Sequence, residues 1–284
     1  MKDHFKHLST YDKHTSCLVA ISTLGDDRVA SVSFETRIHV WDIKDNTLKL
    51  LLDGHKGLIG CLEYLGENML ASGSSDNTVR LWDTADTPMH SSKRQLEVLT
   101  GHTGNVGVLC NLDAELFASG SNDGTIRVWD RGGGATLHTL SGHNDKIDAM
   151  CSLGDRLLLS SGGDGSMRIW DVDAGTQVRL LTEHPNPKVT KLLYLGDGVV
   201  CMCGSGKHDD CLGVINVTQR YVDHARVMPP FRRADSSLQP PLACACPNLA
   251  LPFLEGVGRE ATGRAVGCQG MVRFLASRRR DRGG

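Results

Sequence analysis

The sequence lacks the features that mark membrane-spanning, secreted and nucleic-acid-binding proteins. It contains no run of about 18 apolar residues, the length that a membrane-spanning helix requires. Residues 1–10 are polar and basic, so no signal peptide is expected. A net charge of −2 predicts no general affinity for nucleic acid. We therefore expect a cytoplasmic or nuclear protein whose ten cysteines are reduced thiols.

The sequence also lacks a nucleotide-binding loop, a metal-binding motif and a nucleophile that stands apart from the others. These absences predict a protein with no catalytic residue, no metal, no cofactor and no small-molecule substrate. A hydrophobic share of 40% beside 23% charged residues is sufficient to form a core.

What the sequence does contain is a repeated unit, seen best in residues 101–130. The unit opens with Gly101-His102 and closes with Trp129-Asp130, and its histidine and tryptophan are 27 residues apart. The same interval separates His55 from Trp82, His143 from Trp170 and His14 from Trp41. Lys13 replaces the glycine in the first copy. Each copy has an apolar strand, a short turn, a second strand, an acidic turn and a third strand.

A period of about 40–45 residues with these marks is typical of four-stranded propeller blades. On these motifs the chain resembles the WD-repeat β-propeller family. The resemblance implies an all-β fold, a β-propeller of four-stranded antiparallel blades with four clear blades and a degenerate fifth. The propeller is expected over residues 1–220. Its blades are expected at about 14–54, 55–101, 102–142, 143–183 and 184–217.

Several segments depart from the repeat. Residues 5–10 are expected to form the outer strand of the closing blade, and a longer loop is expected at 84–95. In the fifth blade, Asp210 fits the acidic turn and Asn216 stands where tryptophan is expected. Five blades could close as a small ring, or the gene model could have lost blades after Val217.

The pattern stops after Arg220. Residues 221–284 hold no lysine, ten arginines and five acids, and they include Cys244-Ala-Cys246. So abrupt a change is compatible with a disordered tail. It is equally compatible with translation of an intron or of a wrong frame, and neither reading assigns a function to the tail.

Each clear blade carries a histidine, a serine, a carboxylate and a tryptophan at matching positions. In the family, these side chains form a buried hydrogen-bond relay that joins the strands of one blade. The sets are His55, Ser72, Asp76 and Trp82; His102, Ser119, Asp123 and Trp129; His143, Ser160, Asp164 and Trp170; and His14, Ser31, Glu35 and Trp41. A catalytic triad needs one such set beside a pocket rather than one in every blade. We therefore expect a structural role.

Two further residue groups could bind ligands. Arg80, Arg127 and Arg168 each precede a tryptophan by two positions, which suggests either a phosphate-binding stripe or local stacking and pairing, and we favour the local role. Cys201, Cys203, His208 and Cys211 could bind zinc, but the C-x-C spacing does not match a zinc knuckle. Cysteines in first strands are expected to act as small apolar fillers. They are Cys17, Cys61, Cys110 and Cys151.

A rigid scaffold that presents loops favours binding functions. We expect a non-catalytic scaffold for protein–protein interaction whose partners are other proteins or peptides. The alternative is a substrate receptor of a cullin-type ubiquitin ligase, since such receptors often carry Trp-Asp-x-Arg/Lys, as in Trp41-Asp42-Ile43-Lys44.

The expected binding face combines the residues before the turn acids with residues near the start of the first strands. They are Phe34, Ser75, Asn122 and Gly163, with Leu58, Asn105 and Lys146. Phe34 is the informative member, because no turn requires phenylalanine. It is either an exposed anchor or a cover over the imperfect Glu35 relay.

Overall fold

The structure is a computed structural model that describes residues 10–11, 13–25, 27–86, 94–182, 188–206 and 209–217. The side chains of residues 205, 206 and 209–212 are left undescribed. Residues 5–9 of the strand expected at 5–10 lie outside these ranges, as do the tail expected at 221–284 and part of the loop expected at 84–95. The described ranges contain no helix that is long and apolar enough to cross a membrane.

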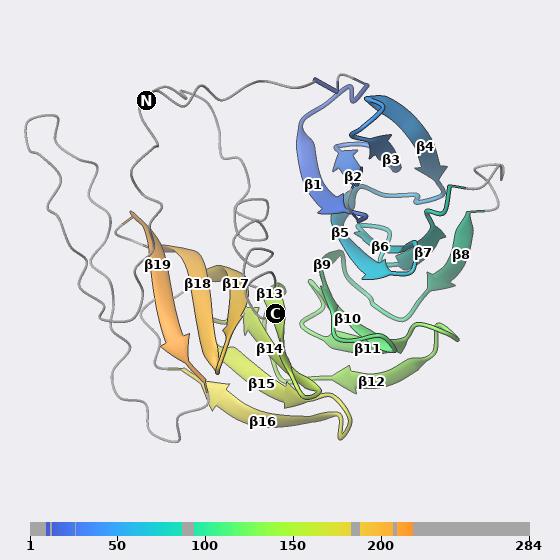
Figure 1. Ribbon diagram of the computed structural model, residues 1–284. Coiled ribbons are helices and arrows are strands. Elements are labelled where there is room, and N and C mark those ends of the chain that lie inside the picture. The colour runs from blue at the N-terminus through green and yellow to red at the C-terminus, as the bar shows by residue number, and fades with distance from the viewer. Residues whose placement is uncertain are drawn as a thin grey trace, which may run out of the picture. The chain divides into compact units, whose positions relative to one another are not determined.

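Four antiparallel sheets of four strands follow one another along the chain, and a sheet of three strands comes after them (Figure 1). The first blade contains β1 (Leu18–Thr23), β2 (Arg28–Ser33), β3 (Arg37–Asp42) and β4 (Thr47–Asp53). The second contains β5 (Ile59–Gly66), β6 (Met69–Ser74), β7 (Val79–Asp83) and β8 (Gln95–Leu99). The predicted all-β propeller fold with four-stranded antiparallel blades is confirmed.

The remaining strands repeat this order. The third blade contains β9 (Val106–Asn111), β10 (Leu116–Ser121), β11 (Ile126–Asp130) and β12 (Thr136–Leu140). The fourth contains β13 (Ile147–Gly154), β14 (Leu157–Gly162), β15 (Met167–Asp171) and β16 (Thr176–Leu181). The fifth contains β17 (Val189–Gly196), β18 (Val199–Gly206) and β19 (Asp209–Asn216).

Burial within a blade changes from strand to strand. Every residue of β10 is buried, whereas most of outer strand β12 is exposed or half-buried. Small residues therefore suit the second strand, because neighbouring blades pack on both of its faces. The outer strand β12 is largely polar and buries only Leu140, as expected of an edge strand that faces water.

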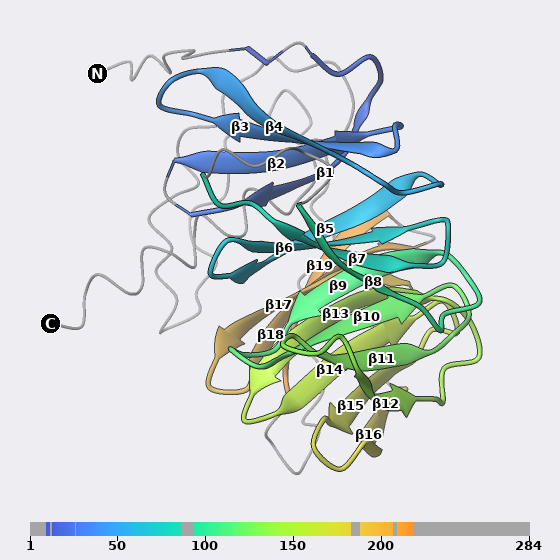
Figure 2. The same cartoon turned by 90° about the vertical axis from the view of Figure 1, so that its right-hand side faces the viewer.

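The blades pack side by side in chain order. Contacts run between successive first strands, from β1 to β5, β9, β13 and β17. Figure 2 shows the sheet β5–β8 between the sheets β1–β4 and β9–β12. Residues from both neighbours form each core cluster; in one of them Leu116 and Ile126 of the third blade pack with Ile147 and Leu158 of the fourth.

Close packing between blades explains the glycine of second strand β6. A Cβ on Gly73 would lie 2.7 Å from Cys61 Sγ and 2.7 Å from Val106 Cγ1. Val106 belongs to the next blade, so the absence of a side chain at residue 73 allows the two sheets to approach.

The fifth blade corrects two sequence-based predictions. Strand β19 begins at Asp209, and Asp210 pairs with Ser205 within the ladder, so Asp210 does not lie in a turn. Ile215 pairs with Val200 as Trp82 pairs with Leu70. Ile215 therefore occupies the tryptophan position that the sequence assigned to Asn216. The prediction was shifted by one residue because the β18–β19 hairpin has longer strands than its counterparts.

Candidate functional site

Three blades contain a continuous hydrogen-bond relay. In the third blade His102 Nδ1 lies 2.9 Å from Asp123 Oδ2, and His102 Nε2 lies 2.8 Å from Ser119 Oγ. Trp129 Nε1 donates to the same serine oxygen over 2.8 Å. Asp123 also accepts the Thr103 and Thr125 amides. The relay therefore connects the start of the blade, its second strand, its acidic turn and its third strand.

The second and fourth blades repeat this geometry. The histidine–carboxylate distances are 2.9 Å in His55–Asp76 and 3.1 Å in His143–Asp164. The histidine–serine distances are 2.7 Å to Ser72 and 2.8 Å to Ser160. Trp82 and Trp170 each donate to their serine over 2.8 Å.

Burial decides the charge state of these relays. Removal from solvent lowers the pKa of His55, His102 and His143, although the partner carboxylates oppose the shift. Burial alone would raise the pKa of Asp123, but hydrogen bonds from Thr125, Thr103 and His102 outweigh it and lower the pKa. Each contact is therefore a hydrogen bond between a neutral imidazole and a carboxylate rather than an ion pair. Since Ser72, Ser119 and Ser160 are fully buried, their hydroxyls are inaccessible to a substrate.

The first blade departs from this arrangement. His14 Nε2 and Trp41 Nε1 both lie 2.7 Å from Ser31 Oγ, as in the other blades. Glu35 Oε1, however, lies 3.9 Å from His14 Nδ1 and instead accepts from the amide and the hydroxyl of Thr15, over 2.8 and 2.7 Å. The relay that was expected to include Glu35 therefore ends at His14.

The three arginines have local partners, but the partners are not acids. Arg80 and Arg168 donate to the side-chain oxygens of Gln95 and Gln177. Arg127 donates to the Gly101 carbonyl over 2.9 Å. The arginines therefore have the local role that was expected, with amide and carbonyl oxygens as their hydrogen-bond acceptors.

The residues expected on a binding face are brought together in pairs by backbone hydrogen bonds. The Ser75 amide donates to the Leu58 carbonyl over 2.9 Å. The Asn122 and Gly163 amides donate to the Asn105 and Lys146 carbonyls, both over 2.8 Å. Each bond fastens a β-turn before the third strand to the residue that precedes the first strand. These six positions therefore lie at the same end of their blades.

The first blade makes the same bond with a residue that the sequence analysis did not place on this face. The Phe34 amide donates to the Cys17 carbonyl over 3.3 Å, and Cys17 is exposed. Cys17 precedes β1, so the prediction that it fills the core is wrong, whereas Cys61, Cys110 and Cys151 are buried. Cys17 lies three residues after His14, as Leu58 and Asn105 lie three residues after His55 and His102. This spacing in the sequence could have placed Cys17 before the first strand.

Phe34 does not fold inward. Its side chain is 58% exposed, and Leu58 of the next blade is 46% exposed. Phe34 therefore does not cover the Glu35 relay. Along the chain, this face begins with the apolar side chains of Phe34 and Leu58 and continues with the polar side chains of Ser75, Asn105 and Asn122. It ends at Lys146, whose Nζ lies 2.6 Å from Asp148 Oδ1. The face changes from apolar to polar along the chain.

The proposed zinc ligands are only partly described. Cys201 and Cys203 are half-buried and are not joined in a disulfide, and their backbones pair with Val214 and Leu212 across the β18–β19 ladder. His208 and the Cys211 side chain lie outside the described part of the chain.

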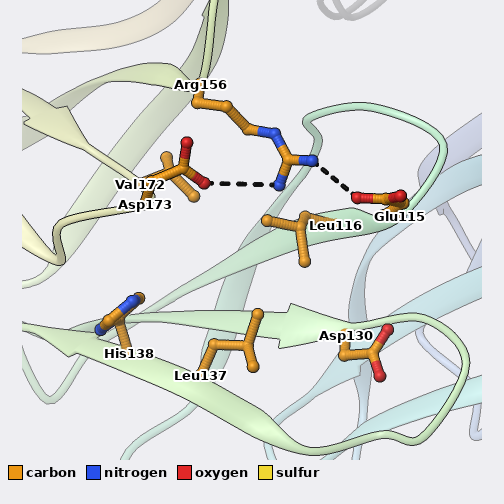
Figure 3. A pocket seen from close by; sticks show the side chains of 8 residues that line it. All are labelled: Glu115, Leu116, Asp130, Leu137, His138, Arg156, Val172 and Asp173. Atoms are coloured by element: carbon orange, nitrogen blue, oxygen red, sulfur yellow. Dashed lines mark hydrogen bonds and ion pairs between the residues drawn. The ribbon is translucent and has the colours of Figure 1, made fainter.

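A pocket between the third and fourth blades is lined by residues of both (Figure 3). Arg156 contributes the central charge. Its guanidinium lies 2.7 Å from Glu115, 2.9 Å from Asp113 and 3.6 Å from Asp173. Because the cation is neutralised by carboxylates from two blades, this group connects the blades rather than offering a free charge to a ligand.

Comparison with known proteins agrees with this architecture. The WD40 family, described as "WD domain, G-beta repeat", matches residues 46–83, 93–130 and 134–171. No curated protein sequence matches the chain.

Two solved structures show a similar fold. One is the WD40 beta propeller domain of Doa1, with 23% identity and a TM-score of 0.64 over 74% of this chain and 68% of that one. The other is a chain of the mitotic checkpoint complex, with 21% identity and a TM-score of 0.63 over 73% of this chain and 63% of that one. The repeated His–Ser–Asp–Trp relays, the three matched repeats and the shared architecture identify the chain as a WD-repeat β-propeller protein.

Proposed function

We propose that this chain is a non-catalytic scaffold that binds a protein or peptide through the end of the blades carrying Phe34 and Leu58. The WD40 propeller fold fits a protein-interaction scaffold, and members of this family are in general non-catalytic. The observation that carries the proposal is the exposure of two large apolar side chains, 58% for Phe34 and 46% for Leu58, at corresponding ends of adjacent blades.

The backbone supports this assignment. The Phe34 amide is bonded to Cys17, and the Leu58 carbonyl accepts from Ser75. Phe34 therefore projects from a fastened turn, and Leu58 projects from the segment to which the next such turn is fastened. A fixed turn loses little conformational entropy when a partner binds. Large apolar side chains that become buried at the centre of an interface commonly supply most of its binding energy. We therefore assign Phe34 and Leu58 as anchors, and Ser75, Asn105, Asn122, Gly163 and Lys146 as the polar remainder of the face.

Cys61, Cys110 and Cys151 are buried and are not joined in disulfides, which supports a location in a reducing compartment, the cytoplasm or the nucleus. The proposed partners are therefore intracellular proteins or their peptides.

The test is quantitative recovery of partners from a cell extract with the full chain and its variants. Phe34→Ala and Leu58→Ala should each reduce recovery of the same proteins while leaving the melting temperature unchanged. Val178→Ala is the matched control, because Val178 is 59% exposed but lies on outer strand β16. Equal recovery with all three variants, or equal loss with Val178→Ala, would exclude this face.

A narrower alternative is a substrate receptor of a cullin-type ligase, and it rests on residues 41–44. Trp41 is buried and bonded to Ser31, whereas Lys44 is exposed and 3.3 Å from Asp27. In this tetrapeptide Ile43 and Lys44 are exposed and Asp42 is half-buried, so these three residues remain accessible to a ligase subunit. Loss of a cullin complex from the recovered proteins with Lys44→Ala, but not with Phe34→Ala, would favour the alternative.

A further inference from the structure

The first blade differs from the next three at two positions that face each other. In blades two to four, a glycine precedes the relay histidine and an arginine stands two residues before the tryptophan. A Cβ on Gly142 would lie 2.9 Å from Arg168 Nη1, and one on Gly101 would lie 2.6 Å from Arg127 Nη1. The first blade has Lys13 and His39 at these positions. Lys13 carries a Cβ where the other blades have glycine. The shorter side chain of His39 therefore fits the space beside residue 13 better than an arginine would.

This replacement places two histidines against each other. The rings of His14 and His39 stack with their centroids 4.0 Å apart and their planes at 9°. His39 is only 5% exposed, and the His14 side chain is 7% exposed. Nδ1 of each ring is buried and has no hydrogen-bond partner in the part of the chain that the structure describes. The corresponding atom of His55, His102 and His143 is bonded to an aspartate. A buried polar atom without a partner is costly, so this pair is built for a contact that the relays do not make.

A carboxylate stands beside the two rings. Glu35, His14 and His39 each place one possible ligand atom within 4.8 Å of the others. Hydrogen bonds from the side chain and the backbone of Thr15 lower the pKa of Glu35 to about 2, so this carboxylate is ionised at neutral pH. Burial lowers the pKa of His14 and His39, which keeps both imidazoles neutral. Two neutral imidazoles and one carboxylate form a ligand set that suits zinc and similar divalent ions.

We propose that His14, His39 and Glu35 form an inducible site for a zinc-class divalent cation, with the remaining coordination position open to water. Ligand atoms at about 2.1 Å from a tetrahedral ion lie about 3.4 Å apart, so the three side chains must draw together. An imidazole nitrogen binds a metal ion that lies in the plane of its ring. Two parallel stacked rings have separate planes, so one ion cannot lie in both, and one ring must turn out of the stack. Rotation about the side-chain bonds of Glu35 can supply part of this movement.

The surroundings of His14 favour coordination through Nδ1. Its Nε2 lies 2.7 Å from Ser31 Oγ, which also accepts a hydrogen bond from Trp41. An Nε2–H that donates to the second lone pair of this hydroxyl would leave Nδ1 unprotonated and would fix the ring. Because Glu35 follows Phe34 directly, a bound ion would also restrain the turn that presents Phe34.

The test is titration of the metal-free full chain with Zn²⁺ by calorimetry, repeated with Co²⁺ by absorption spectroscopy. One equivalent should bind, and the cobalt spectrum should show nitrogen and oxygen ligation without the charge-transfer bands of thiolates. His39→Phe retains an aromatic ring in the stack, and Glu35→Gln retains an acceptor for Thr15. Each should weaken Zn²⁺ binding at least about tenfold, since even a residue that only orients a ligand is worth about 10- to 100-fold.

Cys201→Ser/Cys203→Ser is the matched control, because these thiols are the other potential zinc ligands that are described. The double variant should bind Zn²⁺ as the wild type does. Failure of the wild-type chain to bind Zn²⁺ and Co²⁺ would overturn the proposal. So would unchanged affinity in Glu35→Gln, whose exposed turn should tolerate the change, or loss of binding in the cysteine variant alone.

Discussion

Glu35 Oε1 lies 3.9 Å from His14 Nδ1, beyond hydrogen-bonding range, whereas Asp123 Oδ2 lies 2.9 Å from His102 Nδ1. Glu35 keeps the bond from the Thr15 amide, which corresponds to the bond from the Thr103 amide to Asp123, but it accepts from the Thr15 hydroxyl rather than contacting the histidine. Glutamate has one methylene more than aspartate, and the carboxylate of Glu35 is separated from the relay. The first blade therefore lacks the histidine–carboxylate hydrogen bond that the next three blades share.

Asp123→Ala should lower the free energy of unfolding by about 1–3 kcal/mol, because it removes the acceptor of His102 and of the Thr103 and Thr125 amides. Glu35→Ala should cost less, since it removes only the acceptor of Thr15 at an exposed position. Urea denaturation of both variants gives the comparison. If both variants lost the same free energy of unfolding, the complete relay of the third blade would add no stability beyond that of the first blade.

Acidification should destabilise the protein in two stages. His55, His102 and His143 have lowered pKa values in the folded state, so the unfolded chain takes up protons first, as the pH falls below about 6.5. Asp76, Asp123 and Asp164 also have lowered pKa values, so their contribution is present above about pH 3.9 and is lost below it. Melting temperatures in a buffer series should be flat from pH 8 to about 7 and should fall in these two windows. A rise in melting temperature between pH 7 and 5.5 would contradict the neutral state of the buried histidines.

Gly73→Ala tests the packing between the second and third blades. Its Cβ would lie 2.9 Å from the Val106 carbonyl oxygen as well as close to two side chains, and backbone cannot move aside cheaply. We expect a loss of about 1–3 kcal/mol in the free energy of unfolding. Gly107→Ala is the matched control, because a Cβ there has no neighbour within 4 Å. Chemical denaturation that ranks the control as the more harmful variant would refute the close approach.

The relays and the blade order could be predicted because each depends on spacing that repeats along the chain. The intervals between His102, Ser119, Asp123 and Trp129 recur in two other blades, and antiparallel hairpins of fixed length bring them together. Prediction failed where a hairpin changed length, as at Ile215, whose position follows from the β18–β19 register. Nor did the sequence indicate the His14–His39 stack, because no local pattern relates Lys13 to His39.

That pair gives the last prediction, a double-mutant cycle in the first blade. His39→Arg alone should destabilise the protein, because the guanidinium would meet the Cβ of Lys13 where the other blades have glycine. Lys13→Gly alone should also cost stability, through the flexibility of glycine in the unfolded chain. The double variant recreates the arrangement of Gly142 and Arg168. Its loss in free energy of unfolding should be smaller than the sum of the losses in the two single variants. A coupling free energy of about 0.5–3 kcal/mol is typical of residues in contact. Additive losses in urea denaturation would mean that Lys13 and His39 are independent, and that the histidine stack has another origin.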